Sequence, residues 1–278
     1  HHVKQLKLDL VQPRHNYAPP VSQNRQGHIY MPTSLLTEGA RLLASGVDIA
    51  IHDENIRPRV ISSNFVGVNL LGAPYIPEVI RLREAIDKEV GAEAAYLFGG
   101  QVVSGLTHTQ FKRLFGNSAF NGNNDEVLAA VLGIDIRALV APEKTSLIRA
   151  YEKIPDGIMR EYLSREFSLY VSQGCQFACD FCAAVRTFRD PATGEVTRVK
   201  ESYRDPEIIE RDLEYLVQRA MQLEIKELKI YLSNLDVFQT PTELLKFALA
   251  VEKVRRTHLD FTIKLRGLAT AESFLKTR

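Results

Sequence analysis

Apolar and polar positions repeat with two different periods along the first half of the chain, and this pattern predicts strands separated by helices. Five short apolar runs have the length and composition of strands, at residues 6–13, 47–52, 64–71, 94–98 and 118–120. Stretches with apolar residues three and four positions apart predict helices at 32–44, 77–90, 108–115 and 125–132. Strands that alternate with helices imply an α/β fold with a parallel, doubly wound sheet.

The second half repeats the alternation after a mixed stretch at residues 136–166, where Pro and Gly punctuation predicts a linker. Strands are expected at 168–172, 228–232 and 260–265, and helices at 206–223 and 243–255. We therefore expect one domain at 3–135 and a second at 167–278, with the linker between them.

Three loops of the first domain are rich in small residues and follow successive strands, at 69–73, 99–105 and 121–125. Doubly wound sheets bind ligands at the carboxyl ends of their strands, and glycine lets a backbone approach a ligand closely. Each glycine alone is better explained as a turn residue. Their joint placement predicts a ligand site at this edge of the sheet.

Net charge gives no indication of a nucleic-acid or membrane partner, because 35 Lys and Arg face 34 Asp and Glu. No apolar run approaches the ~20 residues of a membrane span. His1 and His2 are interpreted as the remnant of an expression tag. The composition is typical of a cytoplasmic protein.

All three cysteines of the chain lie within eight residues, as Cys175, Cys179 and Cys182. A cubane of four irons is ordinarily held by four cysteines. Three ligands would leave one iron open for a small molecule or a different ligand, much as catalytic metal sites keep one position free. If a [4Fe-4S] cluster binds to this C-x3-C-x2-C segment, one of its irons therefore has no cysteine ligand.

Other uses of these thiols are weighed against the cluster. The pair Cys179 and Cys182 alone would fit a redox C-x-x-C motif, which leaves Cys175 unexplained. A Cys3His zinc site would need a histidine from far along the chain, such as His108 or His258. A disulfide is disfavoured for clustered cysteines without a secretion signal.

The cysteine motif, with Phe181 before its last residue, resembles the signature loop of the radical S-adenosylmethionine (SAM) enzymes. This resemblance implies that SAM chelates the open iron and that an electron, delivered by an external flavodoxin or ferredoxin, cleaves it to a 5′-deoxyadenosyl radical. It also implies a (β/α) barrel, of which the three β/α units here would form the N-terminal half.

The same resemblance suggests which residues contact SAM. The loop after the strand at 228–232 carries Ser233, Asn234 and Asp236 in place of the Gly-Gly-Glu stretch common in the family. Gly174 and Phe181 would lie beside the cofactor, with Phe181 near the adenine; the alternative for Phe181 is a core aromatic that packs under the loop. Arg266 would meet a carboxylate, although a surface ion pair explains it equally well.

The first domain resembles the cobalamin-binding domains joined to radical SAM enzymes, over nearly all of residues 3–135. The resemblance is carried by Asn69-Leu70-Leu71, by Gly99-Gly100 and by the turn at 122–126, and also by the stretches at 31–36 and 53–55. It implies cobalamin contacts from the residues at these strand ends: Asn69, Leu70, Gly72, Gly99, Gly100, Ser104, Gly122 and Asn123. The D-x-H-x-x-G motif that supplies a lower histidine ligand is absent, so the lower face of cobalt would lack histidine or the pocket would be vestigial.

Together these features predict a cobalamin-dependent radical SAM enzyme, of the kind that transfers methyl from methylcobalamin to an unactivated carbon of a small molecule or peptide. One alternative is a radical SAM enzyme with a vestigial cobalamin domain or with cyclisation or rearrangement chemistry. Another is a binding module stabilised by a saturated metal site. No nucleic-acid partner is expected.

Overall fold

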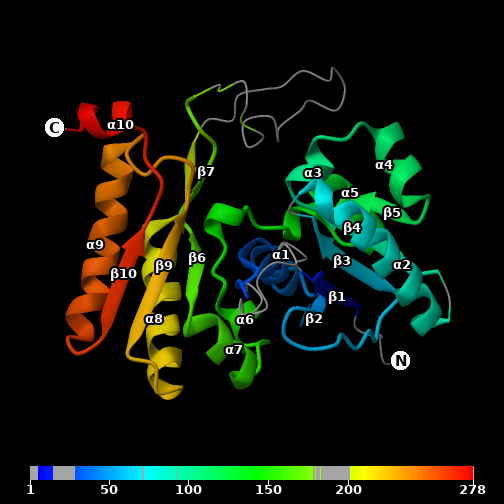
Figure 1. Cartoon of the computed structure of the whole chain (residues 1–278), viewed down its shortest axis with the longest axis horizontal. Coiled ribbons are helices and arrows are strands. Elements are labelled where there is room, and N and C mark those ends of the chain that lie inside the picture. The colour runs from blue at the N-terminus through cyan, green and yellow to red at the C-terminus, as the bar shows by residue number, and fades with distance from the viewer. Residues whose placement is uncertain are drawn as a thin grey trace, which may run out of the picture. The chain divides into compact units, whose positions relative to one another are not determined.

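The computed structural model describes residues 6–14, 29–70, 72–91, 93–177, 179, 182 and 201–277, which fall into two compact units (Figure 1). The first unit contains the described residues of 6–14 and 34–140. The second contains those of 29–33, 141–182 and 201–277. Of residues 136–166, expected as a linker, 136–140 belong to the first unit and 141–166 to the second.

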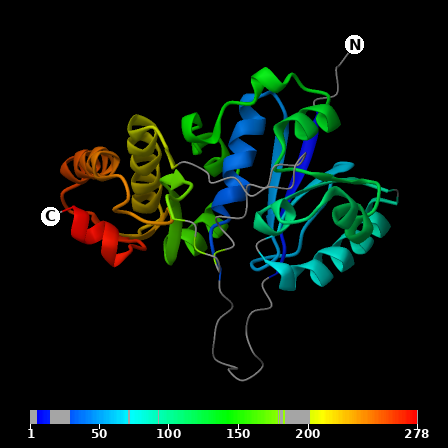
Figure 2. The ribbon, with the colours of Figure 1, turned by 90° about the horizontal axis from the view of Figure 1, so that it is seen from above.

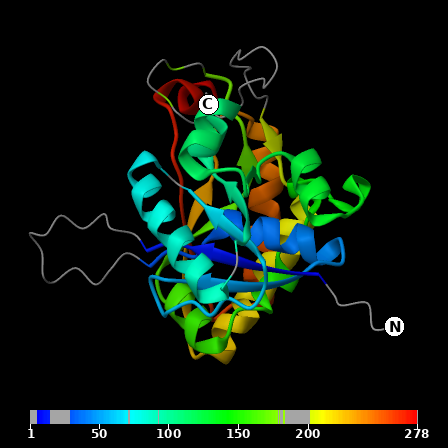
Figure 3. The same ribbon diagram turned by 90° about the vertical axis from the view of Figure 1, so that its right-hand side faces the viewer.

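The first unit is built on a five-stranded parallel sheet in the order β2-β1-β3-β4-β5. Its strands are β1 (Lys7–Gln12), β2 (Asp48–Asp53), β3 (Phe65–Asn69), β4 (Ala95–Gly99) and β5 (Ala119–Asn121). This is the flavodoxin-like order, which reverses direction between β1 and β3. The parallel, doubly wound sheet expected from the sequence is confirmed. Figure 3 shows β1 and β2 lying side by side, in dark and lighter blue.

Helices cover both faces of this sheet (Figure 2). One face packs against α1 (Thr33–Ala44) and α5 (Asp125–Leu132), and the other against α2 (Ile76–Val90), α3 (Gln101–Ser104) and α4 (His108–Phe115). Two 3-10 turns, η1 (Ala73–Tyr75) and η2 (Ile136–Ala138), complete the unit.

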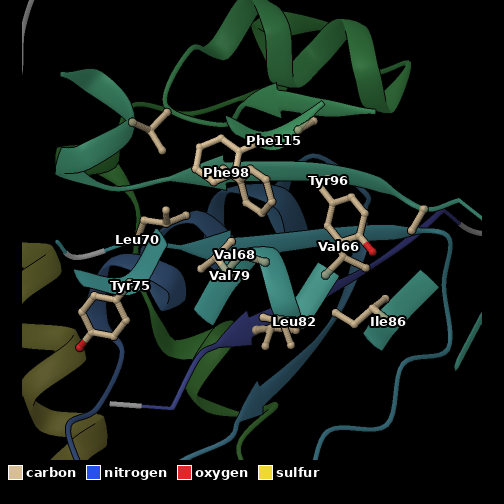
Figure 4. Close-up of a cluster of buried hydrophobic side chains, with 14 of the residues drawn as sticks. Val66, Val68, Leu70, Tyr75, Val79, Leu82, Ile86, Tyr96, Phe98 and Phe115 are labelled. Carbon is tan, nitrogen blue, oxygen red and sulfur yellow. The ribbon is translucent and has the colours of Figure 1, made fainter. Parts of the chain in front are cut away.

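The strands supply both cores by alternation. On β4, Tyr96 and Phe98 point to the face of α2, whereas Leu97 joins the opposite core. Figure 4 shows this first cluster, in which Val79 and Leu82 of α2 lie against the strand side chains. Successive side chains of a strand point to opposite faces, so one short apolar run serves two cores.

The second unit has a three-stranded parallel sheet in the order β10-β9-β6. The strands β6 (Glu166–Tyr170), β9 (Glu227–Ser233) and β10 (Thr262–Arg266) end at one edge, from which β7 (Ser172–Gln173) and α10 (Ala271–Lys276) continue (Figure 1). β7 pairs antiparallel with β8 (Ser202–Tyr203). Among the described residues the sheet is open, so the partial barrel stays a prediction.

Two long helices, α8 (Pro206–Gln222) and α9 (Pro241–Thr257), lie side by side in this unit (Figure 2). His258, directly after α9, contacts Glu214 in the middle of α8, with Nε2 and Oε1 2.5 Å apart. The stretch before β6 adds η3 (Pro142–Lys144), α6 (Ile148–Tyr151) and α7 (Asp156–Leu163).

A buried ion pair attaches this stretch to α8. Arg204 and Asp212 have fully buried side chains and are in contact. Asp212 also accepts hydrogen bonds from the amide of Leu147 at 3.0 Å and the hydroxyl of Ser146 at 2.5 Å. Because buried charges are costly unless paired and hydrogen-bonded, this network fixes Ser146 and Leu147 against α8.

In the described part of the chain, every helix is too short or too polar to cross a bilayer.

Candidate functional site

The cysteine segment leaves the carboxyl edge of the second sheet through a sharp turn. β7 pairs with β8 through Ser172 and Gln173, and Gly174 then takes φ +89°, a left-handed value that favours glycine. Cys175 follows at once. The amide of Val171, just before β7, also donates to the carbonyl of Ser233 at 3.3 Å, so the ends of β6 and β9 lie together.

All three cysteines are free thiols. Cys175 and Cys182 are half-buried, and Cys179 is exposed. The amide of Cys182 donates to the carbonyl of Cys179 at 3.0 Å. Among the described side chains, no group of three or more His, Cys, Asp or Glu is placed to hold a single metal ion.

The thiol of Cys175 has a raised pKa. Burial is the main cause, and the negative charges of Asp236 and the other two cysteines add to it. A hydrogen bond from the backbone amide of Phe177 acts in the opposite direction. Without a cation this thiol is therefore held in its neutral form, whereas metal ligation requires the thiolate.

Two polar side chains hold the cysteine segment in place. Gln239 accepts a hydrogen bond from the amide of Gln176 at 3.0 Å and donates to the carbonyl of Gly174 at 3.4 Å. Glu201 accepts from the hydroxyl of Ser172 at 2.9 Å and from that of Thr240 at 2.7 Å. The loop after β9 and the cysteine segment are thus joined through side chains that were not among the predicted site residues.

Asp236 shapes the loop after β9 from within. Its carboxylate is fully buried and accepts hydrogen bonds from the hydroxyls of Thr270 and Ser273, at 2.9 Å and 2.6 Å, and from the amide of Phe238 at 3.1 Å. Expected as a SAM contact, it is engaged by the start of α10.

Asn234 lies beside Asp236 and is 7% exposed. Its Oδ1 is buried and has no hydrogen-bond partner among the described residues. A buried acceptor without a donor costs free energy, so this atom is suited to receive a hydrogen bond from a ligand. Ser233, at the end of β9, is half-buried and next to it.

Arg266 forms the surface ion pair that the sequence left open. Its Nε donates to Glu166 Oε2 at 3.0 Å, and its guanidinium lies over the Tyr231 ring at 4.9 Å. Hydrogen bonding to Arg266 lowers the pKa of the Glu166 carboxyl. Phe181, expected near adenine, lies outside the described residues.

In the first unit, the loops after β3, β4 and β5 come together as expected. Leu70 N donates to the Gly99 carbonyl at 2.8 Å. The Asn123 side chain accepts from Gly100 N at 2.9 Å, donates to the Gly100 carbonyl at 2.9 Å and donates to Ser104 Oγ at 2.7 Å. Six of the eight residues predicted to contact cobalamin are therefore in one cluster, with Gly122 close by: Asn69, Leu70, Gly99, Gly100, Ser104 and Asn123.

The glycines of this cluster are close to the protein's own backbone. A Cβ on Gly100, where φ is +104°, would lie 2.1 Å from the Leu70 carbonyl oxygen and 2.9 Å from Asn69 Oδ1. A Cβ on Gly122 would lie 3.3 Å from the Phe98 carbonyl oxygen. Gly72 precedes η1 in an extended conformation. Packing between the three loops already requires these small residues.

Gln12 ends β1, next to β3 at the point where the strand order reverses. It is 1% exposed, and its Nε2 has no hydrogen-bond partner among the described residues. Ligands of flavodoxin-like sheets bind at this switch point. The sequence signal was a polar residue that ends the strand directly after the apolar Leu10 and Val11, and Gln12 was not among the predicted site residues.

Comparisons with known proteins identify a similar fold. No protein-family model and no curated protein matches the sequence. The chain is similar to the solved structure of apo, selenomethionine-labelled OxsB, described as a cobalamin-dependent S-adenosylmethionine radical enzyme, with a TM-score of 0.60 and 12% identity over 97% of this chain. It is also similar to OxsB with aqua-cobalamin bound, with a TM-score of 0.51 and 11% identity over 90% of this chain.

The chain corresponds to 39% and 37% of these two structures. At such low identity the likeness shows the fold, which agrees with the α/β organisation derived above.

Proposed function

We propose that the chain belongs to a cobalamin-dependent radical SAM enzyme and that its second domain, residues 167–278, holds a [4Fe-4S] cluster through Cys175, Cys179 and Cys182. The observation that carries this proposal is the three-thiol segment at the carboxyl edge of a parallel sheet, the edge where α/β sheets bind ligands. The fold likeness to a cobalamin-dependent radical SAM enzyme supports it.

The residues present fit these cofactors. Three free thiols in one segment match a cluster with one open iron. Asn234, with a buried acceptor at the same edge, fits the amino group of SAM. In the first domain, residues 3–135, Gln12 has a buried donor at the switch point and fits a polar group of cobalamin.

When bound, these cofactors supply reductive cleavage of SAM and a methyl group carried by cobalt. The chain supplies three thiolates, a braced cysteine segment and polar contacts for SAM from Ser233 and Asn234. Methyl transfer to an unactivated carbon of a small molecule or peptide is the reaction we assign. A flavodoxin- or ferredoxin-type protein is the expected electron donor.

Metal content tests this proposal. Iron, cobalt and zinc per chain are measured after anaerobic purification from cells supplied with cobalamin, for the wild type and for Cys179→Ala. We expect about four irons and about one cobalt in the wild type, with iron lost in the variant.

Iron without cobalt would contradict the cobalamin part and leave a radical SAM enzyme with a vestigial domain. Zinc that persists after cluster reconstitution would contradict the whole proposal. Cys179 is exposed, so its replacement leaves the core packing unchanged and isolates the effect on the cluster.

A further inference from the structure

The side chain of Gln239 holds the backbone on both sides of Cys175. Its Oε1 accepts from the amide of Gln176 at 3.0 Å, and its Nε2 donates to the carbonyl of Gly174 at 3.4 Å. A side-chain amide that pairs with a C=O and an N–H two residues apart takes the place of a neighbouring strand. Both peptide groups next to Cys175 are thereby fixed.

Gln239 is itself held by a loop with a buried anchor. Its own amide donates to the Asp236 carbonyl at 3.3 Å, and the Asp236 carboxylate is bound by Thr270 and Ser273. The side chain therefore projects from a loop that is fixed to α10. A side chain orients a neighbouring segment accurately only if it is itself held in place, and the anchored loop holds Gln239 in this way.

Glu201 makes a second link between the same two segments. It joins Ser172, three residues before Cys175, to Thr240, directly after Gln239. The two links lie on either side of the left-handed Gly174, the point where the chain would otherwise turn most freely.

The orientation of Cys175 matters for a cluster in two ways. A cluster with only three protein ligands depends strongly on each of them, and preorganised ligands bind more tightly. The amide of Phe177, which follows Gln176, also donates to the Cys175 sulfur. Hydrogen bonds to cluster sulfurs tune the reduction potential.

We propose that Gln239 is a positioning residue that orients Cys175 and the Phe177 amide for the iron–sulfur cluster, an inference that rests on the proposed function. It contacts the peptide groups beside Cys175 and acts on the cluster through them. Loss of its two hydrogen bonds would release the segment while the thiols remain.

Three variants of the reconstituted protein test this. Gln239→Leu removes both hydrogen bonds, and Gln239→Glu keeps an acceptor for the Gln176 amide but loses the donor to Gly174. Gln218→Leu is the control, because Gln218 is an exposed glutamine of α8 that bonds within its own helix, to Glu214 at 2.8 Å. The measurements are the rate of iron release to a chelator, the midpoint potential and hydrogen exchange of the Gln176 amide.

We expect Gln239→Leu to release iron about tenfold faster, since two ordinary hydrogen bonds together correspond to about that factor. Its midpoint potential should move to a more negative value, and the Gln176 amide should exchange faster. Gln239→Glu should lie between Gln239→Leu and the wild type, and Gln218→Leu should match the wild type.

Wild-type iron release and midpoint potential in Gln239→Leu would overturn this inference while leaving the cluster assignment in place. Equal acceleration in Gln218→Leu would also overturn it, because the effect would then be one on the fold. A wild type that binds no iron would overturn the proposed function first, and the inference with it.

Discussion

The carboxyl edges of the two sheets are made of similar small and polar residues but are organised differently. In the first unit the loops after the strands are hydrogen-bonded to one another: Asn123 binds Gly100 and Ser104, and Leu70 binds Gly99. In the second unit Gln239 and Glu201 bind a segment that carries three free thiols.

This difference shows how much each sequence pattern says about function. A glycine at a strand end indicates that some group lies close to the backbone. In the first unit, backbone atoms of the neighbouring loops are that group. The three thiols of the second unit lie on a segment that polar side chains hold in place, and packing does not explain them as it explains the glycines. The cluster assignment therefore has stronger support from the residues than the cobalamin assignment.

The largest effect is expected from replacing Asp236, whose buried carboxylate holds the loop after β9 at the carboxyl edge of the second unit's sheet. Asp236→Ala removes a buried carboxylate that accepts from Thr270, Ser273 and the Phe238 amide. Because hydrogen bonds to charged groups are strong, the free energy of unfolding should fall by about 3 kcal/mol in urea denaturation.

Asp260→Ala, at an exposed position of the same unit, should change stability by less than about 0.5 kcal/mol. If Asp236→Ala instead kept wild-type stability and lost only SAM affinity, the carboxylate would belong to the ligand, and our comparison of the two edges would need revision.

Gly100→Ala tests the claim that the first edge is closed by packing. The new Cβ would lie 2.1 Å from the Leu70 carbonyl oxygen at φ +104°, so we expect a loss of about 2–3 kcal/mol. Gly91→Ala shares a positive φ but has open space around it, and should cost only about 1 kcal/mol. Thermal unfolding of both variants without ligand makes the comparison. Equal losses would show that backbone conformation alone, and not contact between loops, requires glycine at Gly100.

Asp9 offers a smaller, pH-dependent test in the first unit. Burial raises the pKa of this carboxyl, but hydrogen bonds from His52 at 2.7 Å and from the amides of Ser62 and Ser63 outweigh it and hold the pKa below its usual value of 3.8. A carboxyl with a lowered folded-state pKa stabilises the fold above its unfolded pKa and loses that contribution as the pH falls through the folded value.

Asp9→Asn should therefore be less stable than the wild type by about 2 kcal/mol at pH 7, and the difference should shrink below about pH 3.8. Urea unfolding of both proteins across this range measures it. A difference that stayed constant with pH would mean that the charge of Asp9 contributes nothing.

The smallest effect is expected from Arg266, whose ion pair with Glu166 is exposed. Solvent screens such pairs, so Arg266→Gln should unfold at nearly the wild-type denaturant concentration. SAM binding should also be unchanged. A large loss of SAM affinity in isothermal titration would restore the carboxylate-binding role that its position after β10 first suggested.

Local signals predicted the elements well where the residues that end them are adjacent in sequence. The helices at 108–115 and 125–132 were predicted with their observed ends. Thr107 and Gln110 form a capping box at the first, and Asn124 caps the second, which Gly133 ends at φ +65°. α10 was missed because it has only six residues and a weak apolar pattern.

The candidate site was predictable only in part, because only some of its residues are close together in the sequence. The cysteines are close together in the sequence, and their spacing was enough to select them as candidate ligands. Gln239 bonds to residues 63 and 65 positions away, and Asp236 to partners 34 and 37 positions away. Which polar side chain turns inward to a buried partner, and which faces a ligand, depends on tertiary contacts that no local pattern encodes.

The electron paramagnetic resonance spectrum of the reconstituted, reduced protein, recorded with and without SAM, tests most directly whether the three cysteines hold a cluster with one iron free for SAM. An open iron predicts a cluster signal that shifts when SAM is added, and no such signal in Cys179→Ala. A cluster signal that stays unchanged when SAM is added, or one that is still present in Cys179→Ala, would contradict a three-thiolate cluster with one position free for SAM.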